Sequence, residues 1–229
     1  NTARIGTAIQ GIAHAEASFQ GALAYARERR SMRAVTGKKE PYANADALIW
    51  HADVRRMLLT QKAIAEGGRA MIYAAAQTAD LMVDAGRRQD RATQDKHDDT
   101  LGFYTPILKG FLTEMGLEAA NHSMQGFGGP GYIHKHGMEQ IARDARLATL
   151  YEGTTGIQAL DLLGRKVLLG TRGKCVRDFS RIMLRSAKAH WLAHGSIGRM
   201  ARSTAKRAIE WNLLTLRIMR RVGKDRDLV

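Results

Sequence analysis

Apolar residues recur at intervals of three and four along most of the chain, which is the spacing of one buried face on an α-helix. Segments rich in Gly, Pro or Asn separate these stretches and predict loops. The expected helices are residues 2–30, 51–85, 102–123, 138–150, 155–168, 176–190 and 197–222. The expected loops are residues 34–45, 87–100 and 126–131, with a short break at residues 151–154.

No segment alternates between apolar and polar residues in the manner of a half-buried strand. The predicted fold class is therefore all-α, an up-and-down helical bundle with extra C-terminal helices. We place the bundle at residues 1–168 and a basic helical extension at residues 169–229. Gly67 and Gly68 interrupt the second long helix, and the helix propensity lost there predicts close packing at that point.

Positive charge is concentrated towards the C-terminus of the chain. Of the 36 Lys and Arg residues, 16 lie between Lys166 and Val229 against four acidic residues, so this segment carries +12 of the formal net charge of +14. Such a surface binds polyanions, for example nucleic acid, an anionic membrane or the phosphates of coenzyme A. A pair of solvated basic helices, or a surface that meets an acidic partner domain, accounts for the same charge, and the sequence leaves these interpretations open.

Cysteine usage and hydropathy narrow the class of protein. Cys175 is the single cysteine, which excludes internal disulfides and favours a reducing, cytoplasmic location. No stretch approaches the roughly 18 uninterrupted apolar residues of a membrane span, and no signal peptide is recognised. The chain opens at Asn1 in a segment typical of a helix already under way, which predicts a fragment of a longer chain, and its end at residues 224–229 is open to the same interpretation.

Two motifs that suggest ligand binding have weak support. The segment Gly126–Gly131 matches the GxGxxG fingerprint, but that fingerprint requires a preceding strand, and here a helix precedes it. A loop whose backbone can approach a phosphate or a ring system, or a structural turn, remains. His51, His122, His134 and His136 lack the paired cysteines, the HExxH motif and the ligand spacing of a metal site, so no metal is predicted.

The break at residues 151–154 carries a candidate general base, Glu152. Among Leu150, Tyr151 and Ile157, its carboxylate is expected to be partly desolvated, which favours the neutral form and suits base catalysis. The same pattern fits a helix N-cap or an acid in a first helical turn, so spacing alone leaves both interpretations open.

Three separated segments resemble the C-terminal bundle of acyl-CoA dehydrogenases. The first is Tyr25-Ala-Arg-Glu-Arg-Arg-Ser-Met-Arg33, similar to the family's YAxxRxxFG element. The second is Gln125-Gly-Phe-Gly-Gly-Pro-Gly-Tyr-Ile133, followed by Arg143-Asp-Ala-Arg146. The third is Tyr151-Glu-Gly-Thr-Thr-Gly-Ile-Gln158. The resemblance covers about residues 2–166, in matching order and spacing, and the long loops and basic tail resemble the subgroup that includes 3-methylmercaptopropionyl-CoA dehydrogenases.

The resemblance implies an FAD-dependent oxidoreductase of fatty-acid β-oxidation that introduces an α,β double bond into acyl-CoA thioesters. Glu152 would remove the pro-R α-proton, and the β-hydride would pass to flavin N5. The Glu152 backbone N–H and a flavin ribityl hydroxyl would stabilise the thioester oxygen as enolate charge develops. The implied partners are an acyl-CoA substrate, an electron-transfer flavoprotein and further subunits in a homodimer or homotetramer.

The resemblance also implies the contacts of other residues. Arg29 would contact the FAD phosphates, and Met32 lies in the same flavin-contacting element, although Met32 and Arg33 stand where many members have Phe-Gly. The residues that would contact FAD are Arg29, Met32, Gln125, Gly128, Gly129 and Thr154, with the glycine loop touching the adenosine half in a neighbouring subunit. The residues that would contact the substrate are Arg4, Tyr151 and Gly153. Gly156 replaces a commonly polar position.

Two other classes of function remain as alternatives. A nucleic-acid-associated relative with the same fold would use the basic C-terminal region to bind duplex DNA, with a steep dependence on salt. A purely structural bundle with a decayed active site would serve oligomerisation, and the complete Tyr-Glu-Gly-Thr element at residues 151–154 argues against it.

Overall fold

The computed structural model describes residues 2–222, and this part of the chain is helical without a β-strand, which confirms the predicted all-α class. Residue 1 and residues 223–229, including the predicted C-terminal end at residues 224–229, lie outside the described residues. The α-helices are α1 Thr2–Glu28, α2 Ala52–Arg87, α3 Arg91–Phe127, α4 Gly129–Tyr132, α5 Met138–Leu150, α6 Thr155–Leu160, α7 Lys174–Ala189 and α8 Gly195–Val222. Short 3-10 helices span Leu48–Trp50 and His134–His136, and a π-helical segment spans Asp161–Gly170. None of these helices is long and apolar enough to cross a membrane.

The chain forms two compact units, one up to Gln158 and a second that begins at Ala159. In the second unit, α7 and α8 pack against each other through small residues, Ala187, Ala201 and Ala205. Phe179 meets Trp211 edge-on, with ring centroids 5.7 Å apart. The division into a bundle at residues 1–168 and an extension at residues 169–229 as separate domains stays a prediction.

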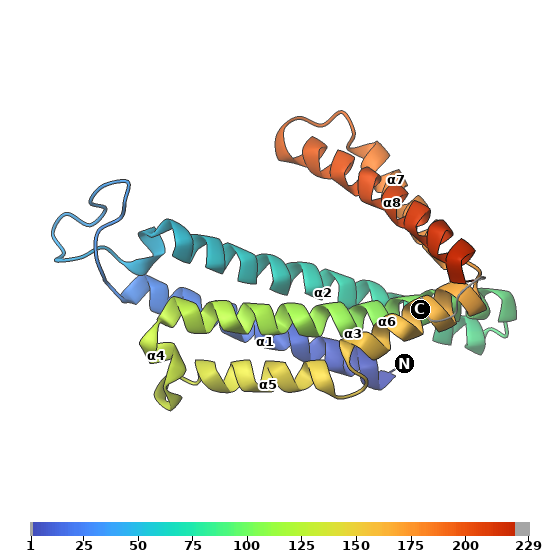
Figure 1. Ribbon diagram of the computed structural model, residues 1–229, viewed down its shortest axis with the longest axis horizontal. Coiled ribbons are helices and arrows are strands. Elements are labelled where there is room, and N and C mark those ends of the chain that lie inside the picture. The colour runs from blue at the N-terminus through green and yellow to red at the C-terminus, as the bar shows by residue number, and fades with distance from the viewer. Residues whose placement is uncertain (1, 223–229) are drawn as a thin grey trace. The chain divides into compact units, whose positions relative to one another are not determined.

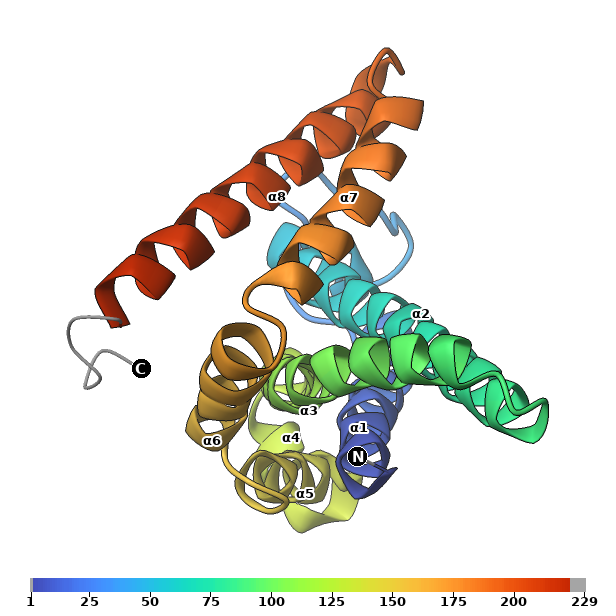
Figure 2. The ribbon, with the colours of Figure 1, turned by 90° about the vertical axis from the view of Figure 1, so that its right-hand side faces the viewer.

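In the first unit, four long helices run alongside one another in alternating directions (Figures 1 and 2). α1 and α3 run parallel and share an extended contact. Gly11 lies against Leu112, and further along both helices Tyr25 stacks on Phe127. α2 and α5 run back in the opposite direction, and both pack on α1 and α3. This arrangement is the predicted up-and-down bundle.

The prediction of a surface loop at residues 87–100 is wrong. α2 continues to Arg87, α3 begins at Arg91, and only residues 88–90 connect them. Asp90 caps α3, because its side chain accepts a hydrogen bond of 3.0 Å from the Thr93 backbone N–H. The first turns of α3 are exposed or half-buried and contain no fully buried residue up to Thr100, so their polar sequence carries no apolar period, although it is helical. The glycine-rich break at residues 126–131 is also shorter than predicted, since α3 reaches Phe127 and α4 begins at Gly129.

The backbones of α1 and α3 touch at two glycines. A Cβ atom on Gly11 would lie 2.5 Å from the Leu112 carbonyl oxygen, and one on Gly116 would lie 2.3 Å from the Gly11 carbonyl oxygen. The predicted close packing of α2 is confirmed at Gly68, where a Cβ atom would lie 2.1 Å from Ile12 Cδ1. It is not found at the neighbouring Gly67, which has open space around it.

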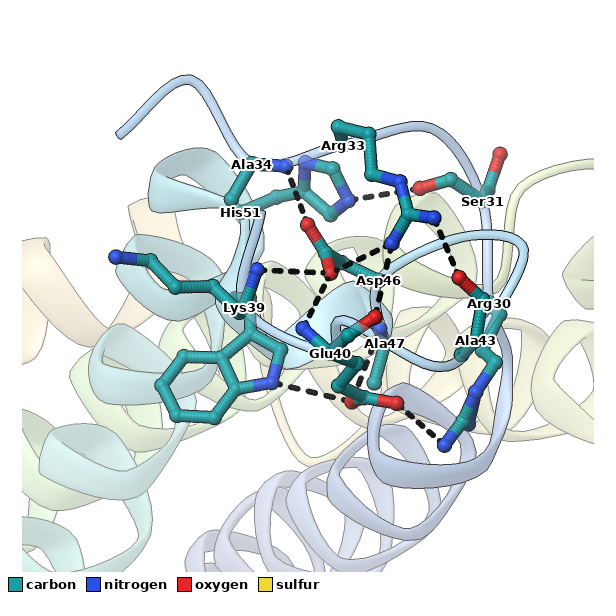
Figure 3. A network of polar contacts seen from close by, with 11 residues as sticks. Arg30, Ser31, Arg33, Ala34, Lys39, Glu40, Ala43, Asp46, Ala47 and His51 are labelled. Carbon is teal, nitrogen blue, oxygen red and sulfur yellow. Dashed lines mark hydrogen bonds and ion pairs between the residues drawn. The ribbon is translucent and has the colours of Figure 1, made fainter. Parts of the chain in front are cut away.

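The loop between α1 and α2 confirms the prediction for residues 34–45 and is held by a buried carboxylate (Figure 3). Asp46 is fully buried and accepts backbone N–H bonds from Ala34, Lys39 and Glu40 at 2.9, 3.0 and 2.8 Å. The guanidinium of Arg33 lies 3.2 Å from the same carboxylate and also donates to two loop carbonyls. Hydrogen bonding from the Ala34 backbone, followed by the Glu40 and Lys39 backbones and Arg33, holds the pKa of Asp46 well below its ordinary value, against the opposing effect of burial.

We expect Gly116→Ala to lower the free energy of unfolding by about 1–3 kcal/mol, because the added methyl group overlaps the Gly11 carbonyl and forces two helix backbones apart. The control is Gly67→Ala, which adds the same methyl group at an exposed helical position and should raise stability by about 0.5–1 kcal/mol. Chemical denaturation of both variants measures the difference. Unchanged stability of Gly116→Ala would contradict the backbone contact.

We expect Asp46→Asn to destabilise the protein at neutral pH, because the amide cannot accept all four hydrogen bonds or balance the Arg33 charge. Since the folded-state pKa of Asp46 is lowered, its stabilising contribution is complete above the unfolded value of about 4 and is lost as pH falls below it. The difference in melting temperature between parent and variant should therefore shrink between neutral pH and strongly acidic pH. Asp80→Asn, at an exposed site on α2, is the control, and a difference independent of pH would contradict this account.

Candidate active site

The turn between α5 and α6 has an unusual backbone. Glu152 has a φ of +56° and Gly153 a φ of +91°, so two consecutive residues adopt left-handed conformations. Glycine adopts this region freely, but a residue with a Cβ atom pays about 1 kcal/mol there. The surrounding structure must therefore hold Glu152 in this conformation. A residue that can act as a base, at a strained backbone position, makes the turn a candidate site.

Gln158 holds this turn from the side of α6. Its side chain is buried, and its Nε2 group donates hydrogen bonds to the carbonyls of Glu152 at 3.0 Å and Gly153 at 3.2 Å. Arg4, near the start of α1, donates from Nη1 to Gln158 Oε1 at 3.2 Å, which fixes which end of the amide faces the turn. A side chain on residue 153 would collide with the amide, because a Cβ atom there would lie 2.7 Å from Gln158 Nε2.

Lys109 holds the same turn from the side of α3. Its side chain is completely buried, and Nζ donates to the Gly153 carbonyl at 2.7 Å and to the Thr149 carbonyl at 3.3 Å. Burial lowers the pKa of the Lys109 ammonium, while the carboxylates of Glu114 and Glu152 act in the opposite direction. The sequence analysis missed this residue, and the signal that pointed to it was a single lysine inside the apolar run that includes Ile107, Leu108 and Phe111.

The Glu152 side chain is exposed in this chain, so the expected desolvation by its sequence neighbours is wrong. Leu150 and Ile157 are themselves 47% and 54% exposed and do not cover the carboxylate. The Tyr151 hydroxyl donates to Gln10 on α1, and Thr154 is exposed. The structure thus brings together Arg4, Tyr151, Glu152, Gly153 and Thr154 at one end of the bundle.

The remaining predicted site residues lie at the other end of the bundle. Tyr25 and Phe127 stack with ring centroids 4.0 Å apart, which places the end of α1 beside the end of α3. The predicted site residues near these two rings are all exposed, and Gly128 has a φ of +65° where α3 ends. This end carries Arg29, Met32, Gln125, Gly128 and Gly129.

The two groups of predicted residues are far apart. Arg4 lies in the first turn of α1 and Arg29 directly follows its last, and a helix of 27 residues is about 40 Å long. A cavity of about 880 Å³ lies between α2 and α3, with Leu59, Ile64 and Phe111 in its mostly apolar lining, and it includes none of the predicted site residues. The predicted residues therefore form two separate surfaces rather than one pocket.

The histidines considered as metal ligands have other contacts. His134 pairs with Glu139 at 2.8 Å, His51 lies 2.9 Å from the Ser31 carbonyl, His122 lies 3.6 Å from Glu118, and His136 packs near the Tyr25 and Phe127 rings. Over residues 2–222, no group of three or more His, Cys, Asp or Glu side chains is placed to hold a metal ion. In the second unit, Cys175 lies 2.9 Å from the Thr171 hydroxyl.

Comparison with known proteins agrees with the resemblance of the three segments. The family described as "Acyl-CoA dehydrogenase, C-terminal domain" matches residues 1–168. A 3-methylmercaptopropionyl-CoA dehydrogenase of Ruegeria pomeroyi is 43% identical over 182 residues, which are 80% of this chain and 30% of the relative. A butyryl-CoA dehydrogenase of Syntrophomonas wolfei is 32% identical over 166 residues, 72% of this chain and 26% of the relative.

The fold also matches a solved structure. The butyryl-CoA dehydrogenase of Megasphaera elsdenii aligns with a TM-score of 0.53 and 23% identity over 71% of this chain and 35% of that chain. The present chain spans less than a third of the length of the two curated relatives. On the match to residues 1–168 and the identity to these relatives, the chain belongs to the acyl-CoA dehydrogenase family and contains its C-terminal helical domain.

Proposed function

We propose that the protein is an FAD-dependent acyl-CoA dehydrogenase that forms an α,β double bond in acyl-CoA thioesters, with Glu152 as the base that removes the α-proton. The observation that carries this proposal is the turn at residues 151–154. An exposed carboxylate sits there on a left-handed backbone whose two carbonyls accept hydrogen bonds from Lys109 and Gln158. The backbone of the base is thus ordered before the substrate binds, and its exposed carboxylate is accessible to a bound substrate.

The α-proton of a thioester is weakly acidic, so the base needs help from groups that stabilise the developing enolate. The Glu152 backbone N–H is the group that the family resemblance assigns to the thioester oxygen. Because Lys109 and Gln158 bond the carbonyls of this turn, they fix the directions of the Glu152 N–H and of its Cα–Cβ bond. Arg4, Tyr151 and Gly153 would contact the acyl-CoA at this end, with Arg4 also bracing Gln158.

The residues at the opposite end fit an FAD. Cβ atoms built on Gly128 and Gly129 meet nothing within 4 Å, and both residues are exposed, so a ligand can approach their backbone. Arg29 is exposed at the same end of the bundle and offers a permanently charged, planar group suited to phosphate. Met32 and Gln125 would complete this surface, and Thr154 would contact the flavin at the other end. Bound FAD would supply the hydride acceptor for the reaction.

The separation of the two ends supports an oligomer. Thr154 belongs to the turn that meets the first part of α1 at Arg4 and Gln10, whereas Arg29 directly follows the last turn of α1, so they would contact different flavins. The glycine loop would then touch the flavin of a neighbouring subunit, in a homodimer or homotetramer. We assign the oxidation of the reduced flavin to an electron-transfer flavoprotein on the family resemblance. We assign the protein to the cytoplasm because its single cysteine fits a reducing compartment.

We expect Glu152→Gln, made in the full-length protein, to slow the exchange of the substrate's α-proton with D2O by at least about 100-fold, because the amide cannot accept a proton. Loss of exchange should be accompanied by loss of flavin bleaching when acyl-CoA thioesters of different chain lengths are added without oxygen. The exposed Glu66→Gln on α2 is the matched control and should behave as the parent protein.

Exchange at the parental rate in Glu152→Gln would contradict the assignment of the base. A protein that contains flavin but is bleached by no acyl-CoA thioester would contradict the reaction itself.

A further inference from the structure

Lys109 is a fully buried lysine inside the bundle, in a segment of α3 whose other buried residues include Leu108 and Leu112. Removing an ammonium group from water is unfavourable unless its donors are paired, so a buried lysine at this position needs an explanation beyond packing. Both of its hydrogen-bond acceptors are backbone carbonyls, Thr149 O and Gly153 O. Neither acceptor is a carboxylate, so the lysine does not simply complete a buried ion pair.

The two acceptors flank the candidate base. Thr149 lies in the last turn of α5, where carbonyls have no partner within the helix, and Gly153 follows Glu152 in the turn. One ammonium therefore ties the end of α5 to the far side of the turn, across the residue that carries the carboxylate. The distances of 3.3 and 2.7 Å allow both bonds at once.

Lys109 and Gln158 bond different sets of carbonyls in and near the turn. Gln158 also reaches the Gly153 carbonyl, but of these two side chains only Lys109 bonds the Thr149 carbonyl at the end of α5 as well. An apolar side chain of similar length would fill the space and leave Gln158 in place. It would release the link between α5 and the turn, and the left-handed conformation of Glu152 would lose part of its support.

α3 supplies a second contact to the same region. Glu114 accepts a hydrogen bond of 2.6 Å from the hydroxyl of Thr155, the first residue of α6. Lys109 and Glu114 thus attach α3 to the segments before and after Glu152, so α3 helps to fix the backbone from which the Glu152 side chain extends.

We propose that Lys109 is a positioning residue of the reaction, which fixes the Glu152 carboxylate by bridging the Thr149 and Gly153 carbonyls. This inference rests on the proposed role of Glu152. Because the Lys109 ammonium donates its hydrogen bonds to backbone carbonyls of the turn and is buried away from any substrate, its removal should slow proton abstraction without weakening substrate binding in proportion.

The test compares Lys109→Met with the exposed Lys62→Met on α2 in the full-length protein. We expect Lys109→Met to slow α-proton exchange of an acyl-CoA thioester about tenfold or more, since small displacements of a catalytic group have effects of this size or larger. Flavin content and the dissociation constant for the enoyl-CoA product should stay within about twofold of the parent. Lys62→Met should match the parent in all three measurements. Parental exchange in a folded Lys109→Met overturns the proposal, as does a loss of exchange fully explained by weaker binding.

A second variant covers the case in which Lys109→Met does not fold. Lys109→Arg keeps the charge, but the longer planar guanidinium cannot place its donors at the same two points. A positioning role predicts slowed exchange with unchanged binding in the folded Lys109→Arg, and exchange at the parental rate overturns it. If neither variant folds, the lysine is purely structural and the proposal is also overturned.

Glu152→Gln, measured alongside, separates this inference from the proposed function. If α-proton exchange persists in Glu152→Gln, Glu152 is not the base and the proposed function is contradicted. Exchange that is lost in Glu152→Gln but unchanged in Lys109→Met leaves the function standing and removes only the role of Lys109.

Discussion

The first unit depends on direct contact between the backbones of α1 and α3 at Gly11 and Gly116. Larger residues would separate the two helices, and both candidate surfaces would move with them. Since α1 and α3 run parallel, the contact at Gly11 and Gly116 sets the register of one helix against the other towards both ends of α1. At one end Arg4 reaches Gln158, and at the other Tyr25 stacks on Phe127.

Two buried ionisable side chains hold segments that connect the helices, one as a hydrogen-bond acceptor and the other as a donor. Asp46 is an acceptor that gathers backbone N–H groups of the loop between α1 and α2. Lys109 is a donor that gathers backbone carbonyls around the turn between α5 and α6. Each charge satisfies polar backbone groups that irregular segments would otherwise leave without partners inside the protein. Each of these connections carries predicted site residues, so the buried charges act where local order matters for binding.

The sequence was sufficient to predict the long helices, their antiparallel order and the turn at Glu152, because apolar spacing and helix breakers report on these features directly. It was insufficient at residues 91–100, where an exposed polar helix has the same composition as a loop. Lys109 was missed because one polar residue hardly alters a helical period, and its partners are backbone atoms 40 and 44 positions away. The exposure of Glu152 could not be predicted either, since its sequence neighbours, Leu150 and Ile157, turn out to be half exposed themselves.

The left-handed backbone at Glu152 lowers the stability of the fold, whereas the proposed reaction needs a carboxylate at this position. Glycine fits a φ of +56° better than any residue with a Cβ atom, so Glu152→Gly would relieve a strain of about 1 kcal/mol. A selection for thermal tolerance alone would therefore favour the loss of the carboxylate. Libraries of this protein screened only for folding would enrich inactive chains at this position, and a folded product there would be no guide to an intact active site.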